Sequence, residues 1–294
     1  MKKFRRILIN IVAVLMMAVC CFSFTACEDI KTLQVNLNVY NTTTQSMEEK
    51  TLTVDLYRHL APNTVDAIVE YVNEGYYNDT FMYIDEENSS QIMLGDLKFT
   101  QDKKIVQNLD ATGKLKNAIN GDFEMNNVKG SNLTNAEGSI GLWRDWYNKG
   151  TKYKTSDGAR DSGRATWFLP TADLSSNYDG WFCVFGQFDV SEGSDSKAVW
   201  ESIKTLLNDA NNYETYSIYY TGEYTNDASA LNNGLTFNCV LSSDYSEVDE
   251  STVFEPEGKH YYGYAKHNVR VPMANKGNKQ NKAVAISISS ITVK

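Results

Sequence analysis

The stretch that decides the fold is Ala165–Phe188, which reads ATWFLPTADLSSNYDGWFCVFGQF. It holds two short apolar runs, Thr166–Leu169 and Trp181–Phe188, both rich in aromatic and β-branched residues. Proline, serine, asparagine, aspartate and glycine surround these runs, and the polar segment between them ends at Asp179-Gly180. Such runs, bounded by turn-forming residues, indicate two β-strands joined by an ordered loop.

The flanking sequence is also rich in strand patterns. Leu33–Tyr40 and Thr51–Tyr57 alternate apolar and polar residues, which predicts a hairpin that turns within Asn41–Lys50. Ala283–Val293 alternates strongly and is expected to close the main sheet. Further short strands are predicted at Thr80–Ile84, Ser90–Leu94 and Glu137–Arg144. The chain is therefore expected to be mainly β.

Two amphipathic helices are predicted. Val65–Glu74 has apolar residues at helical spacing, with Asn63 or Thr64 as the candidate N-cap and Gly75 as the end. Val199–Leu207 is the second helix.

The region Asn208–Lys282 is rich in Asn, Tyr and Ser, and we interpret it as a β-rich insertion before the last strand. Within it, Tyr213–Tyr224 is either a tyrosine-rich binding surface or an ordinary edge strand. Leu97–Lys129 is expected to be a long polar connection with one strand at most, and Asp145–Gly163 a long exposed loop.

The first 27 residues are typical of a bacterial lipoprotein signal peptide. A basic start is followed by an apolar run, and Phe24-Thr25-Ala26 precedes Cys27. We expect lipidation of Cys27 and cleavage before it, with Cys20 as a competing site. An uncleaved anchor or a plain secretory signal are the alternatives. Residues 28–32 are then a tether and residues 33–294 the folded domain, which a lipid anchor holds to the cell membrane on its extracytoplasmic side.

Net charge, cysteines and histidines limit which partners, disulfides and metal sites the sequence predicts. The chain has 28 Lys and Arg against 37 Asp and Glu, and loss of the four cations in the signal lowers the net charge from −9 to −13. Nucleic acid is therefore not an expected partner. Cys183 and Cys239 lie in apolar runs, and the sequence leaves open whether they pair. The scattered histidines predict no metal site.

Several segments recur in the order seen in one family. They are TVDLYRHLAPNTVDAIVEYVNEGYYNDT (Thr53–Thr80), Leu94-Gly95-Asp96, GSIGLWR (Gly138–Arg144), ATWFLPTA (Ala165–Ala172), DGWFCVFGQF (Asp179–Phe188) and VAISISSITV (Val284–Val293). In this order they resemble the cyclophilins, a family of peptidyl-prolyl cis-trans isomerases. The resemblance covers about Leu33–Leu207 and the last eleven residues. It implies a closed eight-stranded antiparallel β-barrel capped by two α-helices.

Prolyl isomerisation breaks no covalent bond, and its barrier of roughly 18–20 kcal/mol comes from amide resonance. A catalyst must favour the twisted amide, which takes an apolar pocket for the proline ring and a cation or donor aimed at the imide nitrogen. No cofactor and no metal is needed. The resemblance implies that proline-containing peptide segments, or unfolded secreted proteins, are the partners.

Catalytic candidates follow from the resemblance. Phe81-Met82-Tyr83-Ile84 is similar to the strand that carries the family's arginine, so Tyr83 or Ile84 occupies the arginine position. Met93 occupies the glutamine position, and Gln91 shares its strand face and could substitute. Arg144 falls at the groove edge. The substrate-binding candidates are Phe81, Thr166, Phe168, Tyr178 and Phe182, the last of which replaces the family's histidine.

Aromatic residues in strands also have a purely structural interpretation. In that interpretation, Phe168 and Phe185 belong to the core of the barrel and do not contact a ligand. Trp167 and Trp181 would then lie on the opposite face as surface contacts.

Two functions remain open at the sequence level. One is an isomerase that assists protein folding outside the membrane, with activity weakened or lost. The alternative is a catalytically inactive peptide- or protein-binding module on the cell surface. An adhesin dominated by residues 208–282 is a third possibility.

Overall fold

The structure is a computed structural model that describes residues 30–101, 104–122, 133–144, 163–221, 236–241, 267–276 and 282–294. The predicted signal peptide with Cys27, most of the predicted loop Asp145–Gly163 and much of the predicted insertion lie outside these residues. No helix within the described ranges is both long and apolar enough to cross a membrane.

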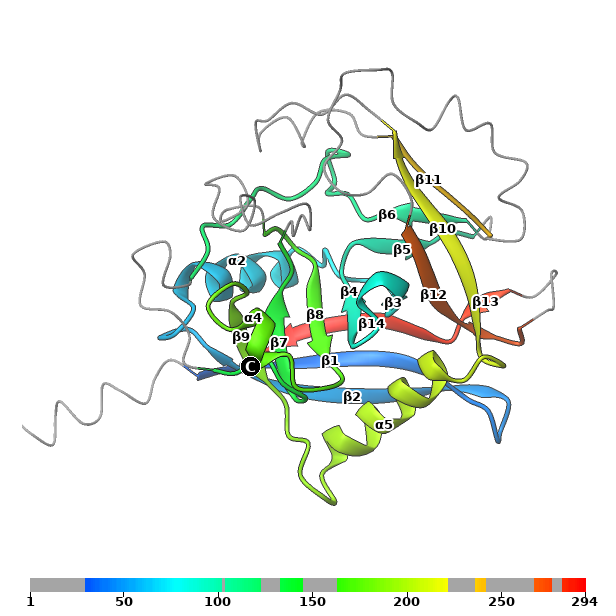
Figure 1. The fold of residues 1–294 in the computed structure, drawn as a ribbon, viewed down its shortest axis with the longest axis horizontal. Helices are drawn as coiled ribbons and strands as arrows, with labels where there is room; N and C mark the ends of the chain where they lie inside the picture. Colours follow the sequence, from blue (N-terminus) through cyan, green and yellow to red (C-terminus); the bar gives the residue numbers. More distant parts are fainter. Residues whose placement is uncertain are drawn as a thin grey trace, which may run out of the picture.

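A seven-stranded sheet forms the body of the described chain (Figure 1). Its strands lie in the order β14-β1-β2-β9-β7-β8-β4, and every neighbouring pair is antiparallel. The strands are β1 (Ile30–Asn41), β2 (Ser46–Tyr57), β4 (Gln91–Leu94), β7 (Ser139–Leu142), β8 (Trp167–Pro170), β9 (Val184–Gln187) and β14 (Ile286–Val293). The mainly β fold is confirmed, and the last strand joins the main sheet as an outer strand beside β1.

The predicted strand Thr80–Ile84 is reduced to bridges and a two-residue strand, β3 (Ile84–Asp85). Phe81 pairs with Ser287 of β14, and Tyr83 pairs with Met93 of β4. The segment therefore lies between the two outer strands of the sheet and bonds to both. A small hairpin, β5 (Leu97–Phe99) and β6 (Ile105–Gln107), follows, so the predicted long connection holds two strands.

The first helix, α2 (Pro62–Asn73), starts earlier than predicted. Pro62 is its first residue, and the predicted capping by Asn63 or Thr64 is wrong, because both residues lie inside the first turn. The carboxylate of Asp122 instead accepts hydrogen bonds from the backbone N–H groups of Asn63 (3.3 Å) and Thr64 (2.6 Å). A distant residue thus satisfies the exposed donors that an N-cap usually satisfies.

The helix α2 ends as predicted. Gly75 has a φ of +69°, and its N–H donates to the carbonyl of Val72 while that of Tyr76 donates to Tyr71. This left-handed termination favours glycine.

Two more helices follow. α4 (Ser175–Tyr178) is a single turn in the loop between β8 and β9. α5 (Asp195–Asn208) begins four residues before the predicted range, because the side chain of Ser194 caps it by accepting from the N–H of Lys197.

The remaining strands form a second sheet, here called the inserted sheet: β10 (Tyr213–Thr221), β11 (Thr236–Leu241) and β12 (His267–Ala274). β10 lies between β11 and β12, so the interpretation of Tyr213–Tyr224 as an edge strand is wrong. β12 pairs in turn with β3 and with β13 (Ala283–Val284), which places the inserted sheet beside β3 and β4 (Figure 1).

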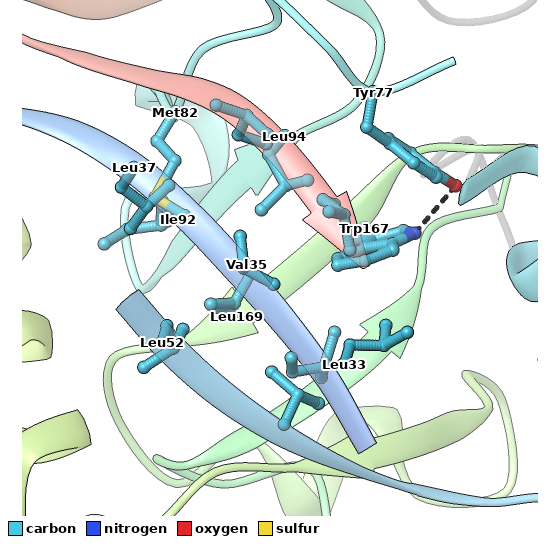
Figure 2. Close-up of a cluster of buried hydrophobic side chains, with 14 of the residues drawn as sticks. Leu33, Val35, Leu37, Leu52, Tyr77, Met82, Ile92, Leu94, Trp167 and Leu169 are labelled. Carbon is cyan, nitrogen blue, oxygen red and sulfur yellow. Dashed lines mark hydrogen bonds between the residues drawn. The ribbon is translucent and has the colours of Figure 1, made fainter. Parts of the chain in front are cut away.

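The inner core lies between β1, β2, β14, the two long helices and the inner faces of β4 and β8. Trp167 is fully buried there, and its indole N–H donates to the hydroxyl of Tyr77 at 2.9 Å (Figure 2). The prediction that Trp167 is a surface contact is therefore wrong. Cys183 is also buried in this core as a free thiol, so it does not pair with Cys239.

Candidate functional site

In β8, in β4 and in the segment before β3, successive side chains point alternately to two faces of the sheet and join two different packed clusters. In β8, Trp167 and Leu169 enter the inner core, whereas Phe168 points to the other face of the sheet. β4 and the segment before β3 follow the same rule, because side chains of a strand alternate between its faces. The outward members are Gln91 and Met93 on β4, and Phe81 and Tyr83 before β3. The predicted site residues on these segments therefore share one face.

We call this second set of packed side chains the outer cluster. It contains Phe81, Tyr83, Met93, Leu97, Ile105, Phe168, Phe182, Tyr216, Ile218, Val269, Val271 and Met273, with Phe99, Trp143, Tyr178, Trp181 and Val284 packed against it. Phe185 lies in the inner core, so its interpretation as core is confirmed, whereas Phe168 is equally buried but lies in the outer cluster.

The predicted arginine position is occupied by Tyr83, and Ile84 points into the inner core. Tyr83 exchanges two backbone hydrogen bonds with Met93, at 3.0 and 2.8 Å. Its hydroxyl donates to Oδ2 of Asp96 at 2.7 Å. Burial raises the pKa of Asp96 to about 6, although the hydrogen bond from Tyr83 opposes this shift. The phenol of Tyr83 is thus held by a carboxyl group.

Gln91 lies beside the predicted glutamine position. Its side chain is 1 % exposed, and Nε2 donates to the sulfur of Met93 at 3.3 Å. Its Oε1 has no hydrogen-bond partner among the described residues. A buried amide oxygen without a hydrogen-bond partner lowers the stability of the fold, and it indicates a position where a ligand or a water molecule could donate a hydrogen bond.

Aromatic rings surround Phe168. The rings of Trp143, Tyr178 and Phe182 lie edge-on to it, with centroids 6.0, 5.5 and 5.4 Å away. Trp143 also stacks on Phe182 at 5.2 Å. We call these four residues the aromatic cluster. Tyr178 and Trp143 are half-buried, so the cluster reaches the surface of the described chain at one end.

Glycine makes room for this arrangement. Gly141 of β7 pairs directly with Phe168, and a Cβ on Gly141 would lie 2.2 Å from the Phe168 ring. No side chain larger than hydrogen fits there without displacing the ring. The ring of Phe168 therefore occupies the space beside Gly141 that a side chain would fill.

Arg144 brings a cation to the aromatic cluster. Its guanidinium carbon lies 5.6 Å from the ring centroid of Phe182 and 6.0 Å from that of Trp181, and the residue is 3 % exposed. Thr166 is half-buried next to it, and its carbonyl accepts from the N–H of Trp143 at 2.8 Å. The predicted site residues on β4, directly after β7, in or directly before β8 and in the loop before β9 thus lie near the aromatic cluster.

The outer cluster also contains residues that sequence reasoning missed. Tyr216 and Ile218 come from β10, and Val269, Val271 and Met273 from β12. Together with β5 and β6 they leave Phe81 and Phe168 with no exposed surface. The apolar residues Val269 and Val271 alternate with the polar Asn268 and Arg270, and this period of two is the signal that could have revealed β12.

Comparison with known proteins now identifies the class. The sequence profile of the family described as "Cyclophilin type peptidyl-prolyl cis-trans isomerase/CLD" matches residues 39–219. The chain therefore belongs to the cyclophilin-type peptidyl-prolyl cis-trans isomerase family. The match extends from β1 to within β10 and includes every predicted site residue except Cys27.

Solved structures give a distant likeness. A cyclophilin-type peptidyl-prolyl cis-trans isomerase from Cryptosporidium parvum is 14% identical, with a TM-score of 0.38 over 61% of this chain and 85% of that chain. The same protein in the presence of the dipeptide Ala-Pro gives 14% identity and a TM-score of 0.37 over 60% and 85% of the two chains. No protein with a curated description matches this chain.

Proposed function

We propose that this protein is an extracytoplasmic, lipid-anchored cyclophilin that binds proline-containing segments of unfolded secreted proteins and isomerises them weakly. The observation that carries the proposal is the aromatic cluster around Phe168 with the Arg144 guanidinium beside it. An apolar aromatic pocket with a cation at its edge is the combination that prolyl isomerisation needs.

The weakness of the activity follows from Tyr83. A phenol hydroxyl that already donates to Asp96 is a poorer partner for a pyramidal imide nitrogen than a guanidinium would be. Arg144 brings a cation to Phe182, but it follows β7 and does not lie on β4 or β3. Loss of one well-placed donor costs roughly 3–4 kcal/mol of transition-state stabilisation, or about two to three orders of magnitude in rate.

Substrate roles are proposed from the placement of the remaining residues. Phe81, Phe168 and Phe182 form the wall for the proline ring, and Tyr178 and Thr166 form the rim. Gln91, with its free amide oxygen, accepts a hydrogen bond from a backbone N–H of the bound peptide. Met93 adds apolar surface. We further propose that the segment before β3 completes an eight-stranded closed barrel through its bonds to β14 and β4.

The location is proposed from the signal pattern. Lipid attached to Cys27 would hold the protein at the outer side of the cell membrane, and residues 28–32 would be its tether. The mature net charge of −13 suits a soluble domain outside the membrane and disfavours nucleic acid.

The specific alternative is a peptide-binding module without catalysis. The observation that favours it is the commitment of the Tyr83 hydroxyl to Asp96, together with the full burial of Phe168.

A protease-coupled isomerisation assay on Ala-Pro peptides tests the proposal. We expect a rate above the uncatalysed one for the wild-type protein, and a further loss of at least tenfold in Arg144→Gln. Arg164→Gln is the control, because Arg164 is a half-buried arginine that donates to the carbonyl of Lys116 outside the outer cluster. No rate above background, with peptide binding retained, would establish the non-catalytic alternative. No rate and no binding would refute both.

A further inference from the structure

The inserted sheet packs on the face of the barrel that the site occupies. Val269, Val271 and Met273 of β12 alternate along the strand and all enter the outer cluster. Their neighbours in sequence, Asn268 and Arg270, are half-buried on the other side of β12. An extended strand that offers alternate apolar side chains to an apolar groove has the form of a bound peptide.

The residues under this strand are those that the peptide would need. Phe81 and Phe168 are both 0 % exposed, and Tyr83 and Met93 are nearly so. Without Val271 and Met273 against them, these side chains would form a contiguous apolar surface of the kind that marks a ligand groove. The site is therefore occupied by a part of its own chain.

The inserted sheet is better paired within itself than with the barrel. β10 and β12 pair from Tyr213↔Pro272 to Ile218↔His267, and β10 pairs with β11 from Tyr216↔Leu241 to Thr221↔Thr236. Its ladder to β3 consists of Val269↔Asp85 and Arg270↔Ile84, and its other described ladder is the short one with β13. The described backbone pairing of the inserted sheet to the rest of the chain is therefore short, and its other contact is made by the apolar side chains of β10 and β12 in the outer cluster.

One ion pair holds the inserted sheet beside β3. Nε of Arg270 lies 3.2 Å from Oε1 of Glu86, which is in the 3-10 turn η1 (Glu86–Asn88) directly after β3. The two side chains are 26 % and 32 % exposed, so they can be changed without opening the interior.

We propose that the inserted sheet is an autoinhibitory contact: β10 and β12 occupy the peptide groove, and peptide binds only when they swing away from β3. This inference rests on the proposed function, because it assigns the outer cluster as the groove. Binding of a peptide then competes with closure, so the apparent dissociation constant equals the intrinsic one divided by the open fraction.

The test uses the full chain and a fluorescent Ala-Pro peptide, titrated by anisotropy. Glu86→Arg places two cations together and opens the sheet, and we expect roughly two- to fivefold tighter binding. The double variant Glu86→Arg/Arg270→Glu restores the ion pair and should return to the wild-type value. Glu192→Arg is the control, since it breaks the exposed ion pair with Lys197 far from the outer cluster.

An engineered disulfide between β3 and β12 tests the opposite change, because it holds the inserted sheet closed. Asp85 and Val269 are directly paired across the β3–β12 ladder, and Cα atoms of such pairs are roughly 4.5–5.5 Å apart, within disulfide range. The oxidised Asp85→Cys/Val269→Cys variant should not bind the peptide, and reduction should restore binding. Hydrogen exchange of β12 amides, compared with β1 amides, reports opening without any peptide.

The outcomes separate the two ideas. If the oxidised lock binds peptide as well as the reduced protein does, autoinhibition is overturned while the proposed function stands. Slow exchange of β12, equal to that of β1 in every variant, overturns the opening itself. If β12 exchanges fast in Glu86→Arg and still no variant binds peptide, the proposed function fails, and the inhibitory role falls with it.

Discussion

Replacing Asp96 by asparagine should abolish a pH dependence of stability in the acidic range. Burial raises the pKa of this carboxyl from 3.8 to about 6 in the folded protein. Because the folded state holds the proton more tightly than the unfolded chain, Asp96 contributes most to stability below about pH 4. That contribution is lost as the pH rises to about 6 and the carboxylate forms.

The size of the effect follows from the same shift. A difference of about two pKa units corresponds to roughly 3 kcal/mol. Asn keeps an oxygen that accepts from the Tyr83 hydroxyl but carries no charge. The variant should therefore be more stable than the wild type at pH 7 and equal to it near pH 4.

Urea unfolding at pH 4, 5, 6 and 7, followed by tryptophan fluorescence, measures the difference. A stability difference between wild type and Asp96→Asn that stays constant across this range would refute the argument. Asp110→Asn provides a control of opposite sign, because hydrogen bonds from Thr112 and Lys114 lower the pKa of the exposed Asp110. Asp110 therefore stabilises the fold at neutral pH and loses that effect on acidification.

Three further changes probe the packing and the site. Gly141→Ala should displace the Phe168 ring and lower the free energy of unfolding by about 1–3 kcal/mol in chemical denaturation. It should also weaken binding of an Ala-Pro peptide. Unchanged binding would contradict the place of Phe168 in the groove. Asp122→Ala should cost about 2–3 kcal/mol, because it leaves the N–H of Thr64 without its acceptor, and an unaltered urea midpoint would show that this capping is unimportant. Cys183→Ser should destabilise the fold by about 1–3 kcal/mol in the same assay, because it places a hydroxyl in the apolar core, whereas a neutral result would mean that Thr64 satisfies it.

Strands in which apolar and polar residues alternate regularly were predictable from the sequence. β1, β2 and β14 have clear inward and outward sides, so their period of two indicated both their type and their role. β8 was harder, because both of its faces are buried and all of its residues are apolar. The apolar character of these residues therefore does not show which face each side chain occupies. Trp167 enters the inner core, whereas Phe168 enters the outer cluster.

Long-range partners account for the other differences. Nothing near Pro62 in the sequence indicates that Asp122 will serve as its helix cap. Similarly, the family resemblance brought Tyr83, Met93, Phe168, Tyr178 and Phe182 into one site, and the structure places them together. It carried no information about β10 and β12, because the resemblance seen in the sequence covers about Leu33–Leu207 and the last eleven residues.

The central claim, that the outer cluster binds proline-containing peptides, is tested most directly by an NMR titration of the isotope-labelled protein with an Ala-Pro dipeptide. The account predicts saturable shift changes centred on the amides of Phe168, Tyr178 and Phe182, with α2 unaffected. No shift change at saturating dipeptide, or changes confined to α2 and the outer side of β2, would contradict it.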